Sequence, residues 1–556
     1  MTTETTDGTE GPARAAGGGQ LSPFRYPAFA TIWTASLVSN TGTQLQQVGA
    51  GWLMTSLTAS HDMVALVQTA ATLPVMVFAL LAGAFADNMD RRRIMLAAQG
   101  FMLLAALALA LMTWAGQVTP WLLLLFTFLI GSGKALHNPA WQASVGDLVP
   151  RSDLPQAVLL NGIGFNMTRS VGPALGGMII AATGAAAAFA LNAASFLFML
   201  GALLRWRPAP RPTHLPRENI WRAIWDGMRY VSMSPSIQRV ILRGTVFGLG
   251  STSLLALLPV VTRELLQGGP TSFGLLLGFF GLGAIGGGFA NGWLRTRLSP
   301  EGRARTGFVL FALALLWIAA SPAIWLTAPA MGVAGASWVL TLSLLNATVQ
   351  LATPRWVVGR AISIYQSGVF GGMALGAWAW GAVADAASIP VALSLAALVL
   401  LLGALAGAAL PLPDAERLDL DPLDRFREPA LRLDIRARSG PIAVMVDYEI
   451  DQADVDAFLA IMAIRRRIRL RDGARRWSLM RDLENPRLWT ESYHVATWTE
   501  YVRHNLRRTK ADADSVDRLR ALHRGSGRPR VHRMIERPTV PKHDDMPLRD
   551  DGHLGH

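Results

Sequence analysis

Apolar residues gather into twelve stretches of this chain, each near the roughly 20 residues that an α-helix needs to cross a bilayer. Short segments with polar and charged residues separate them. The stretches cover residues 28–53, 63–86, 94–114, 119–143, 156–183, 185–204, 240–262, 272–293, 306–325, 328–352, 360–384 and 388–410. This pattern predicts an all-α membrane protein with twelve transmembrane helices in a lipid bilayer.

Basic residues occur in alternate connections between the stretches. Arginines follow every second stretch, whereas the connections on the other side hold one basic residue, Arg263. Basic loops stay on the cytoplasmic side, so we expect both termini in the cytoplasm and a location in the bacterial cytoplasmic (inner) membrane. This distribution accounts for the formal net charge of +13 without nucleic acid as a partner. The chain has no cysteine, which excludes disulfides and thiolate metal sites. We expect neither a metal nor a cofactor.

The apolar region repeats itself at an offset of 204 residues. Residues 83–93 align with 287–297, and Gly172 aligns with Gly376. Transporters are often built from two such repeats with a substrate site between them. The repeat predicts two pseudo-symmetric six-helix bundles, at 21–206 and 239–410, joined by a cytoplasmic central loop at 207–238.

A soluble pattern replaces the apolar one after residue 410. Residues 411–440 are rich in Pro, Asp and Arg and have the composition of a linker. Residues 441–537 predict strands and helices in the order βαββαβ, which indicates a cytoplasmic α+β domain of the ferredoxin-like type. The tails at 1–20 and 538–556 are polar, and we expect them to be disordered.

One motif lies where the second stretch meets the cytoplasm. Gly83 allows close helix packing, and Asp87 can pair with a guanidinium in one state of a transport cycle, with Arg91 and Arg92 following. A plain cluster of positive charge after a helix is the alternative. The motif resembles the G-x-x-x-D-x-x-G-R-R/K pattern of the major facilitator superfamily, with Asp90 in place of its usual glycine. The second copy has Asn291 in place of the Asp, so we expect a charged latch in one half only.

A second motif, Gly172-Pro173-x-x-Gly176-Gly177, lies in the fifth stretch. It is similar to an element of the superfamily's antiporters, and this resemblance implies export. A generic small-residue packing face is the alternative. The run from Asn138 to Arg169 is similar to the branch with enterobactin exporters and macrolide-efflux-like proteins. That resemblance covers residues 21–410 and implies export of a siderophore-like or drug-like small molecule by alternating access.

Two basic residues lie well inside predicted spans, and each costs roughly 3 kcal/mol to insert there. They are Lys134 and Arg169, and we expect both to face a polar cavity suited to an anionic substrate. The other candidate cavity residues are polar and lie nearby along the spans or in the first span: His137, Asn138, Asn161, Asn166, Gln44 and Gln47. The alternative is that Arg169 bonds backbone carbonyls and Lys134 snorkels.

The sequence indicates a transporter rather than an enzyme, with no catalytic residue assigned. No ATP-binding motif is present, so ion-coupled antiport, with protons as the coupling ion, is the expectation from the family. No carboxylate lies at mid-span, which leaves Asp87, His137 or the substrate itself to couple protons. The C-terminal domain resembles the dimeric α+β barrel group of antibiotic-biosynthesis-type monooxygenases. A homodimerisation module, a membrane-tethered oxygenase and a non-transporting scaffold all stay open at this point.

Overall fold

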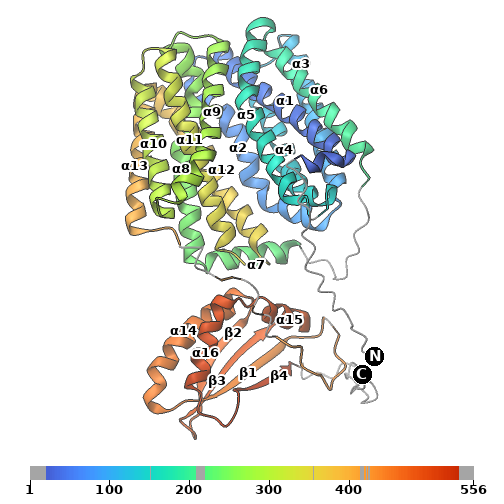
Figure 1. The fold of residues 1–556 in the computed structure, drawn as a ribbon, viewed down its shortest axis with the longest axis vertical. Coiled ribbons are helices and arrows are strands. Elements are labelled where there is room, and N and C mark those ends of the chain that lie inside the picture. Colours follow the sequence, from blue (N-terminus) through green and yellow to red (C-terminus); the bar gives the residue numbers. More distant parts are fainter. Residues whose placement is uncertain are drawn as a thin grey trace, which may run out of the picture.

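The computed structural model shows a helical body above a smaller domain that contains a sheet (Figure 1). It describes residues 21–207, 220–413 and 419–536, except 151, 355, 421, 422, 424, 425 and 437. Side chains at 84, 86–88, 220, 222, 223 and 514 are also not described. The two tails predicted at 1–20 and 538–556 therefore lie outside the described residues.

Helices of at least 21 residues build the body. The first half holds α1 (Pro27–Leu57), α2 (His61–Asn88), α3 (Arg91–Trp114), α4 (Pro120–Leu148), α5 (Leu154–Thr183) and α6 (Ala185–Arg205). The second half holds α8 (Pro235–Val260), which continues as a π-helical turn at Val261–Leu265, then α9 (Pro270–Arg295), α10 (Pro300–Ala320), α11 (Ile324–Leu351), α12 (Val358–Ala386) and α13 (Ile389–Ala409).

Among the described residues, nine helices are long and apolar enough to cross a membrane. They are α2, α3, α4, α6, α8, α9, α10, α11 and α13. Three helices of similar length, α1, α5 and α12, fall outside this group. Their sequences carry more polar residues and glycine, for example Gln44, Asn161 and Ser367.

A short helix, α7 (Ile220–Ser232), lies inside the segment that the sequence predicted as a plain central loop. It packs under the helical body against α2, α8 and α12 (Figure 1). Its residues divide by face: Trp221, Trp225 and Met228 are exposed, whereas Asp226 and Tyr230 are buried. The loop prediction missed α7 because its apolar residues are spaced by three or four positions and never form a continuous run.

The C-terminal part forms one antiparallel sheet with helices against it. Its elements are β1 (Ile442–Glu449), α14 (Val455–Arg471), β2 (Arg475–Arg481), β3 (Leu488–Val495), α15 (Trp498–Leu506), α16 (Lys510–Leu522) and β4 (Arg530–Ile535). The strands lie in the order β2-β3-β1-β4. Alternate residues of β1, such as Val444, Val446 and Tyr448, are buried in its core with Phe458 of α14.

A charged group lies inside this core. Glu491 of β3 is fully buried and accepts hydrogen bonds from Arg465 (2.8 Å), Arg469 (3.2 Å), Trp477 Nε1 (3.1 Å) and the Tyr448 hydroxyl (3.2 Å). Burial alone would raise the pKa of Glu491, but the two guanidinium groups outweigh it and hold that pKa well below its usual range. The carboxylate is therefore ionised at neutral pH and neutralises part of the charge of α14.

Replacing Glu491 by glutamine should destabilise this domain by about 3–5 kcal/mol, because two buried guanidinium groups lose their anion. Glu491 contributes its full stabilisation above the usual glutamate pKa, which applies to the unfolded chain. This stabilisation is lost as the pH falls towards the lower pKa that Glu491 has in the folded domain. Hydrogen exchange of the 488–495 amides in the full-length protein measures the effect. Glu500→Gln, which removes the ion pair to Arg503 on α15, is the matched control, with a loss below about 1 kcal/mol. Equal exchange in both variants would contradict this account.

Candidate functional site

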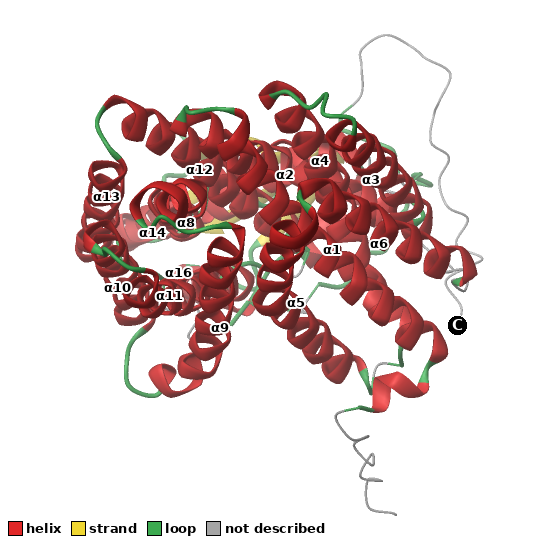
Figure 2. Ribbon diagram, turned by 90° about the horizontal axis from the view of Figure 1, so that it is seen from above, coloured by secondary structure: helices red, strands yellow, loops and turns green. Residues whose placement is uncertain are grey.

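The two halves of the helical body meet along two helix pairs. Seen from above, α2 lies beside α12 and α5 lies beside α9 (Figure 2). Each pair joins one helix of the first half to one helix of the second. The repeat in the sequence predicted a site between two halves, and the candidate residues are therefore considered relative to these two seams.

Arg169 of α5 lies at the α5–α9 seam. Its guanidinium carbon is 5.3 Å from the ring centre of Phe280 (α9) and 5.5 Å from that of Trp338 (α11), both in the other half. Among the described residues its guanidinium makes no hydrogen bond and no ion pair. A cation over an aromatic face gains about 0.5–2 kcal/mol, which is less than a carboxylate partner would supply. The structure thus places rings, rather than backbone carbonyls, beside this charge.

The two rings belong to a larger aromatic cluster in the second half. Trp338 lies 5.9 Å from Phe280 and between 6.2 and 6.3 Å from Phe247 and Phe311. All four side chains are buried. A pairing between Arg169 and this cluster could not be predicted, because the rings lie at least 78 positions away from Arg169 on other helices.

Lys134 of α4 is the second charge in this region. It is half-buried and lies within electrostatic range of both Arg169 and His137. No ion pair of Lys134 is found among the described residues. The structure therefore brings together the two intramembrane cations that the sequence singled out, without an acidic partner from the described part of the chain.

The remaining polar candidates divide into separate places. His137 is buried and faces α3, where Gln99 Nε2 lies 3.4 Å from its ring nitrogen. Asn166 donates to the Gly162 carbonyl of its own helix (2.9 Å), while Asn138 is exposed and Asn161 is half-buried. The structure thus sets His137 inside the first half rather than at a seam.

The glutamines of α1 differ from one another in their contacts. Gln47 Nε2 lies 3.4 Å from Gln68 Oε1 of α2, and Gln44 packs over Gly172 of α5. A third glutamine, Gln46, is buried and accepts from Asn192 of α6 (3.3 Å). The sequence did not single out Gln46, because it is next to Gln47 in the chain and therefore lies on another face of α1.

The small-residue motif of α5 contacts both halves. Gly172 and Gly176 face Gln44, Leu45 and Val48 of α1 in the same half. Gly177 faces α9, where a Cβ on it would lie 2.5 Å from the Pro270 carbonyl oxygen and 3.0 Å from the Gly274 Cα. The Pro173 carbonyl oxygen lies equally close to a Cβ built on Gly274. Backbone therefore meets backbone across this seam, which side chains larger than hydrogen would prevent.

The predicted latch region lies at the opposite end of the helices. Gly83 faces Ser363 of α12, and a Cβ on it would lie 3.0 Å from the serine hydroxyl. Arg91 donates to the Ala143 carbonyl (2.6 Å) and pairs with Asp147 of α4 (3.2 Å). The side chain of Asp87 lies outside the described residues, so the latch stays a proposal.

The next two residues of this region stay within the first half. Arg92 donates to the carbonyls of Leu203 and Leu204 at the end of α6, both at 2.9 Å. Asp90 caps α3 by accepting from the backbone N–H groups of Arg92 (2.9 Å) and Arg93 (3.4 Å). An acidic N-cap stabilises a helix start, which explains an aspartate at this position.

The structure also shows contacts that the sequence did not predict. The Asp385 carboxylate at the end of α12 accepts from the Ser60 hydroxyl (2.8 Å) and from the backbone N–H groups of His61 (2.7 Å) and Asp62 (3.0 Å) at the start of α2. The His61 ring lies 3.1 Å from Glu264, after α8. We call these residues, Ser60, His61, Asp62, Glu264 and Asp385, the terminal clamp. The only signal in the sequence was that the acids lie near span ends.

A second unpredicted cluster is centred on Glu301 at the start of α10. Its carboxylate accepts from buried Arg243 of α8 (2.9 Å), from Arg305 (3.0 Å) and from the backbone N–H of Leu412 beyond α13 (3.0 Å). The cluster ties three elements of the second half together. It is structural, because none of its members lies at a seam.

The terminal clamp and the Gly177–Gly274 contact lie at the same end of the body. The clamp involves the start of α2, and the glycine contact involves the start of α9. Both helices begin at the end of the body that is farther from α7 (Figure 1). The halves are thus joined at this end by two independent contacts. Towards the other end, a Cβ built on Gly162 of α5 or Gly286 of α9 would meet no atom within 4 Å.

Comparison with curated proteins shows transporters. The chain is 25% identical to the Staphyloferrin A transporter of Staphylococcus aureus over 259 residues, which is 46% of this chain and 64% of that protein. It is 25% identical to the multidrug efflux pump Tap of Mycolicibacterium fortuitum over 400 residues, 70% of this chain and 96% of the relative. It is 27% identical to the enterobactin exporter EntS of Salmonella typhi over 361 residues, 63% of this chain and 84% of the relative. The match thus spans less than two thirds of the first of these relatives.

Solved structures show the same fold. A POT family transporter in complex with 5-aminolevulinic acid aligns with a TM-score of 0.57 at 11% identity, covering 69% of this chain and 96% of that structure. A bacterial homolog of the human lysosomal transporter Spinster, inward-facing and unoccupied, aligns with a TM-score of 0.54 at 12% identity, covering 69% and 94%. These likenesses are of fold alone.

Residues 18–539 match the model of one family, described as transmembrane secretion effectors of the major facilitator type. The match confirms the major facilitator resemblance and continues beyond residue 410, where that resemblance ended, through the C-terminal sheet. The family and the relatives indicate a multi-pass transporter of the inner membrane rather than an enzyme. The chain therefore belongs to the transmembrane secretion effector family of major facilitator transporters.

Proposed function

We propose that this transporter exports a small organic anion, with Arg169 and Lys134 as the charges that bind it. The observation that carries the proposal is the position of Arg169, at the seam between halves and over rings of the opposite half. A charge in a membrane span is retained where it has a role, because it costs roughly 3 kcal/mol to insert. A bound anion would supply the partner that the described residues do not.

The aromatic cluster adds a preference for flat solutes. Phe280 and Trp338 present ring faces beside the charge, and a planar carboxylate or catechol can lie against them while it contacts Arg169. Siderophore-like substrates fit this chemistry better than neutral drugs. The relatives named for staphyloferrin A and enterobactin agree with this choice, and the macrolide and multidrug relatives represent the alternative.

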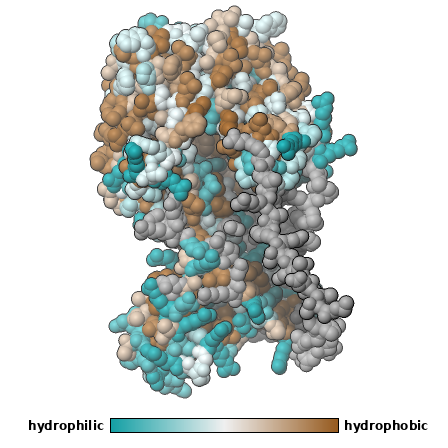
Figure 3. All heavy atoms as spheres, in the orientation of Figure 1, coloured by the Kyte–Doolittle hydropathy of each residue, from teal (hydrophilic) through white to brown (hydrophobic). Residues whose placement is uncertain are grey.

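The membrane embedding that we propose has twelve spans. Besides the nine apolar helices, we propose that α1, α5 and α12 also cross the membrane. Helices that line a polar path need fewer apolar residues than helices that face lipid. Apolar side chains cover much of the helical body in Figure 3. Exposed tryptophans lie at both of its ends: Trp114, Trp121 and Trp325 at one and Trp221, Trp225 and Trp293 at the other. Such belts mark the two membrane interfaces.

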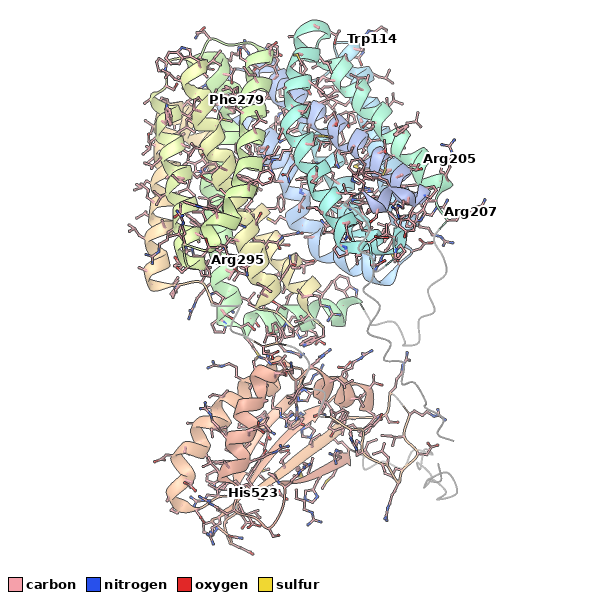
Figure 4. All side chains as sticks on the ribbon, viewed as in Figure 1. Trp114, Arg205, Arg207, Phe279, Arg295 and His523 are labelled. Carbon is pink, nitrogen blue, oxygen red and sulfur yellow. The ribbon has the colours of Figure 1, made fainter. Side chains whose placement is uncertain are left out.

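The orientation that we propose places the α7 end in the cytoplasm. Arg295 lies towards that end, Arg207 lies nearer to it than Arg205, and Trp114 lies at the other end (Figure 4). Basic residues are retained on the cytoplasmic side, so both termini and the C-terminal domain belong there. The two contacts between halves at the far end then describe a state closed to the outside. Alternating access would break these contacts and rearrange the Gly83–Asp87 region, where Gly83 already meets Ser363 of α12, with Arg91 and Arg92 holding the region to α4 and α6.

We propose protons as the coupling ion, in exchange for the substrate. His137 supports this choice, since it is a titratable group within electrostatic range of Lys134. A change of charge at His137 would alter the field at the proposed binding site without direct contact with the substrate. The Gly172–Gly177 element supports export as the direction of transport, because it resembles the antiporter element. It also lies where the two halves pack together.

The C-terminal domain fits a ferredoxin-like arrangement in our proposal. The strand order β2-β3-β1-β4, with every neighbouring pair antiparallel, is the order of that fold. The sheet face away from α14 carries Met445, Met480 and Met534. Dimeric α+β barrels join such faces, so we propose homodimerisation through this domain.

Transport by purified protein in liposomes tests the proposal. With an imposed pH gradient, we expect movement of enterobactin and staphyloferrin A, and at least about tenfold slower movement of erythromycin, because its positive charge opposes that of Lys134 and Arg169. Collapse of the pH gradient should stop net transport. Rapid transport of erythromycin with no movement of either siderophore would overturn the anion proposal.

A further inference from the structure

The C-terminal domain contains a cavity of about 650 Å³ beside its sheet. This volume lies within the range of small-molecule sites, roughly 300–1,000 Å³. Tyrosines 448, 493 and 501 form part of its wall. The basic residues of the wall come from the linker, α14, the α15–α16 turn, α16, the α16–β4 loop and β4: Arg427, Arg465, Arg469, Arg508, Arg520, Arg528 and Arg533.

The charges of this wall are not balanced among the described residues. Glu491 behind the wall serves both Arg465 and Arg469, and Arg520 pairs with Asp517 at 3.7 Å. Arg533 donates to the Tyr501 hydroxyl rather than to a carboxylate (2.6 Å). No carboxylate lines the cavity within the part of the chain that is described. The wall therefore carries an excess of positive charge.

Arg508 is the arginine of the wall that a bound anion would stabilise most. Its guanidinium makes no hydrogen bond and no ion pair to any described residue. Burial and the nearby Arg469 lower the pKa of Arg508 to about 10, so it stays charged at neutral pH. Arg508 is half-buried, so its charge is partly removed from water without a partner among the described residues, and a bound anion would offset that cost.

His504 cannot take the place of that anion. It is buried, and burial together with Arg469 lowers its pKa well below the usual value. The neutral ring accepts from Arg469 (3.0 Å) through Nε2 while Nδ1 donates to the Asp472 carbonyl (3.3 Å). Arg469 is thereby held in place over the Tyr493 ring, 4.3 Å from its centre. The wall is thus a fixed arrangement before any ligand arrives.

We propose that this cavity binds a small anion with at least two carboxylate or phosphate charges, which Arg508 and Arg469 hold against the Tyr493 side of the wall. Guanidinium groups suit such ligands, because they bind both oxygen atoms of a carboxylate or phosphate at once. The site is separate from Arg169 and Lys134, and it does not depend on the proposed export substrate.

The neighbouring residue connects this site to the transport body. Arg507 points away from the cavity, pairs with Asp226 of α7 (3.3 Å) and lies over the Trp356 ring between α11 and α12 (4.1 Å). It also donates to the Asp472 carbonyl (3.1 Å). Two consecutive residues thus link the two parts of the protein: Arg508 lines the cavity, and Arg507 contacts α7 and the α11–α12 connection at the end of the helical body. A ligand that fixes Arg508 also fixes the turn that holds Arg507, so the site is placed to make transport respond to a cytoplasmic anion.

Binding of citrate and inorganic pyrophosphate to the full-length protein in detergent, measured by calorimetry, tests the inference and separates carboxylate from phosphate ligands. We expect at least one of them to bind, and Arg508→Gln to weaken its binding about tenfold or more, since a charged hydrogen bond contributes roughly 1.5–3 kcal/mol. Arg508→Lys should restore part of the affinity. Arg467→Gln is the matched control, because it removes an exposed arginine of α14 outside the cavity wall.

Two results would overturn this inference. One is binding of neither anion to the full-length protein. The other is equal binding by Arg508→Gln and the wild type. Arg169→Ala separates this site from the export site: loss of binding in Arg169→Ala with retention in Arg508→Gln assigns the anion to the membrane seam, whereas the reverse supports the cavity. Unchanged hydrogen exchange of the 488–495 amides in Arg508→Gln confirms that the domain stays folded, which is expected because this side chain has no hydrogen-bond or ion-pair partner among the described residues.

Discussion

Export by the Arg169→Ala variant should fall at least about a hundredfold while the protein still inserts into the membrane. The guanidinium is the charge that lies at the α5–α9 seam and touches rings of the opposite half. Loss of a charge-assisted contact of roughly 3 kcal/mol in the transported complex corresponds to this factor. Efflux from liposomes preloaded with the siderophore that moves fastest measures the effect.

Arg297→Ala is the matched control for this experiment. Arg297 also lies over a tryptophan, with its guanidinium carbon 4.0 Å from the Trp293 ring centre, but the pair is exposed at the end of α9. Its removal should leave export within about twofold of the wild type, as exposed charges contribute little. Arg169→Lys keeps the charge and loses the flat guanidinium, so intermediate export is expected. Wild-type rates in Arg169→Ala would remove this residue from the binding site.

Replacing Gly177 by alanine should reduce transport at least about fivefold by opposing closure of the seam. The added methyl group meets the backbone of Pro270 and Gly274, which cannot rotate away. Overpacking of this kind costs about 1–3 kcal/mol, and the cost falls only on the state in which α5 and α9 touch. The population of that state should therefore fall by a factor of about 5 to 150.

Spin labels report this shift directly, because the chain contains no cysteine of its own. Thr183→Cys at the end of α5 and Thr271→Cys at the start of α9 are exposed, and the distance between their labels should lengthen in Gly177→Ala. Gly162→Ala is the control on the same helix, since a Cβ there meets no atom within 4 Å. If both variants gave the wild-type distance and rate, close backbone approach at Gly177 would have no role in the cycle.

The sequence predicted the parts of this fold that follow from local pattern and solvation. Apolar runs gave the long helices, and alternation within 442–449 gave a strand with one buried face. Lys134 and Arg169 were predicted to lie together because their depth follows from counting residues along two helices. The C-terminal strands were predicted for the same reason, since each is a short run with its own turn signals.

Partners that lie far apart in the sequence could not be predicted. The rings beside Arg169 come from α9 and α11, and nothing in the pattern of those helices separates Phe280 from Phe279. His137 was assigned to the cavity, whereas its orientation depends on the rotation of α4 against α3 and brings it to Gln99. Asp385 was recognised only as an acid near a span end, because its partners lie more than three hundred residues earlier. Single-sequence periodicity carries no information on such contacts.

The terminal clamp sets a limit on how firmly this end of the protein can stay shut. Three hydrogen bonds link the Asp385 carboxylate to the start of α2, and each contributes about 1.5–3 kcal/mol because the acceptor is charged, less where water competes. Inverting a conformational ratio from 99:1 to 1:99 takes about 5.5 kcal/mol, so the three bonds together are of the order needed to hold this end shut. When the halves separate, water can solvate the freed amides at once, because they lie at an exposed helix end. Asp385 thus holds this end shut only against changes of this size, so opening requires substrate or proton binding that favours the opposite state by several kcal/mol.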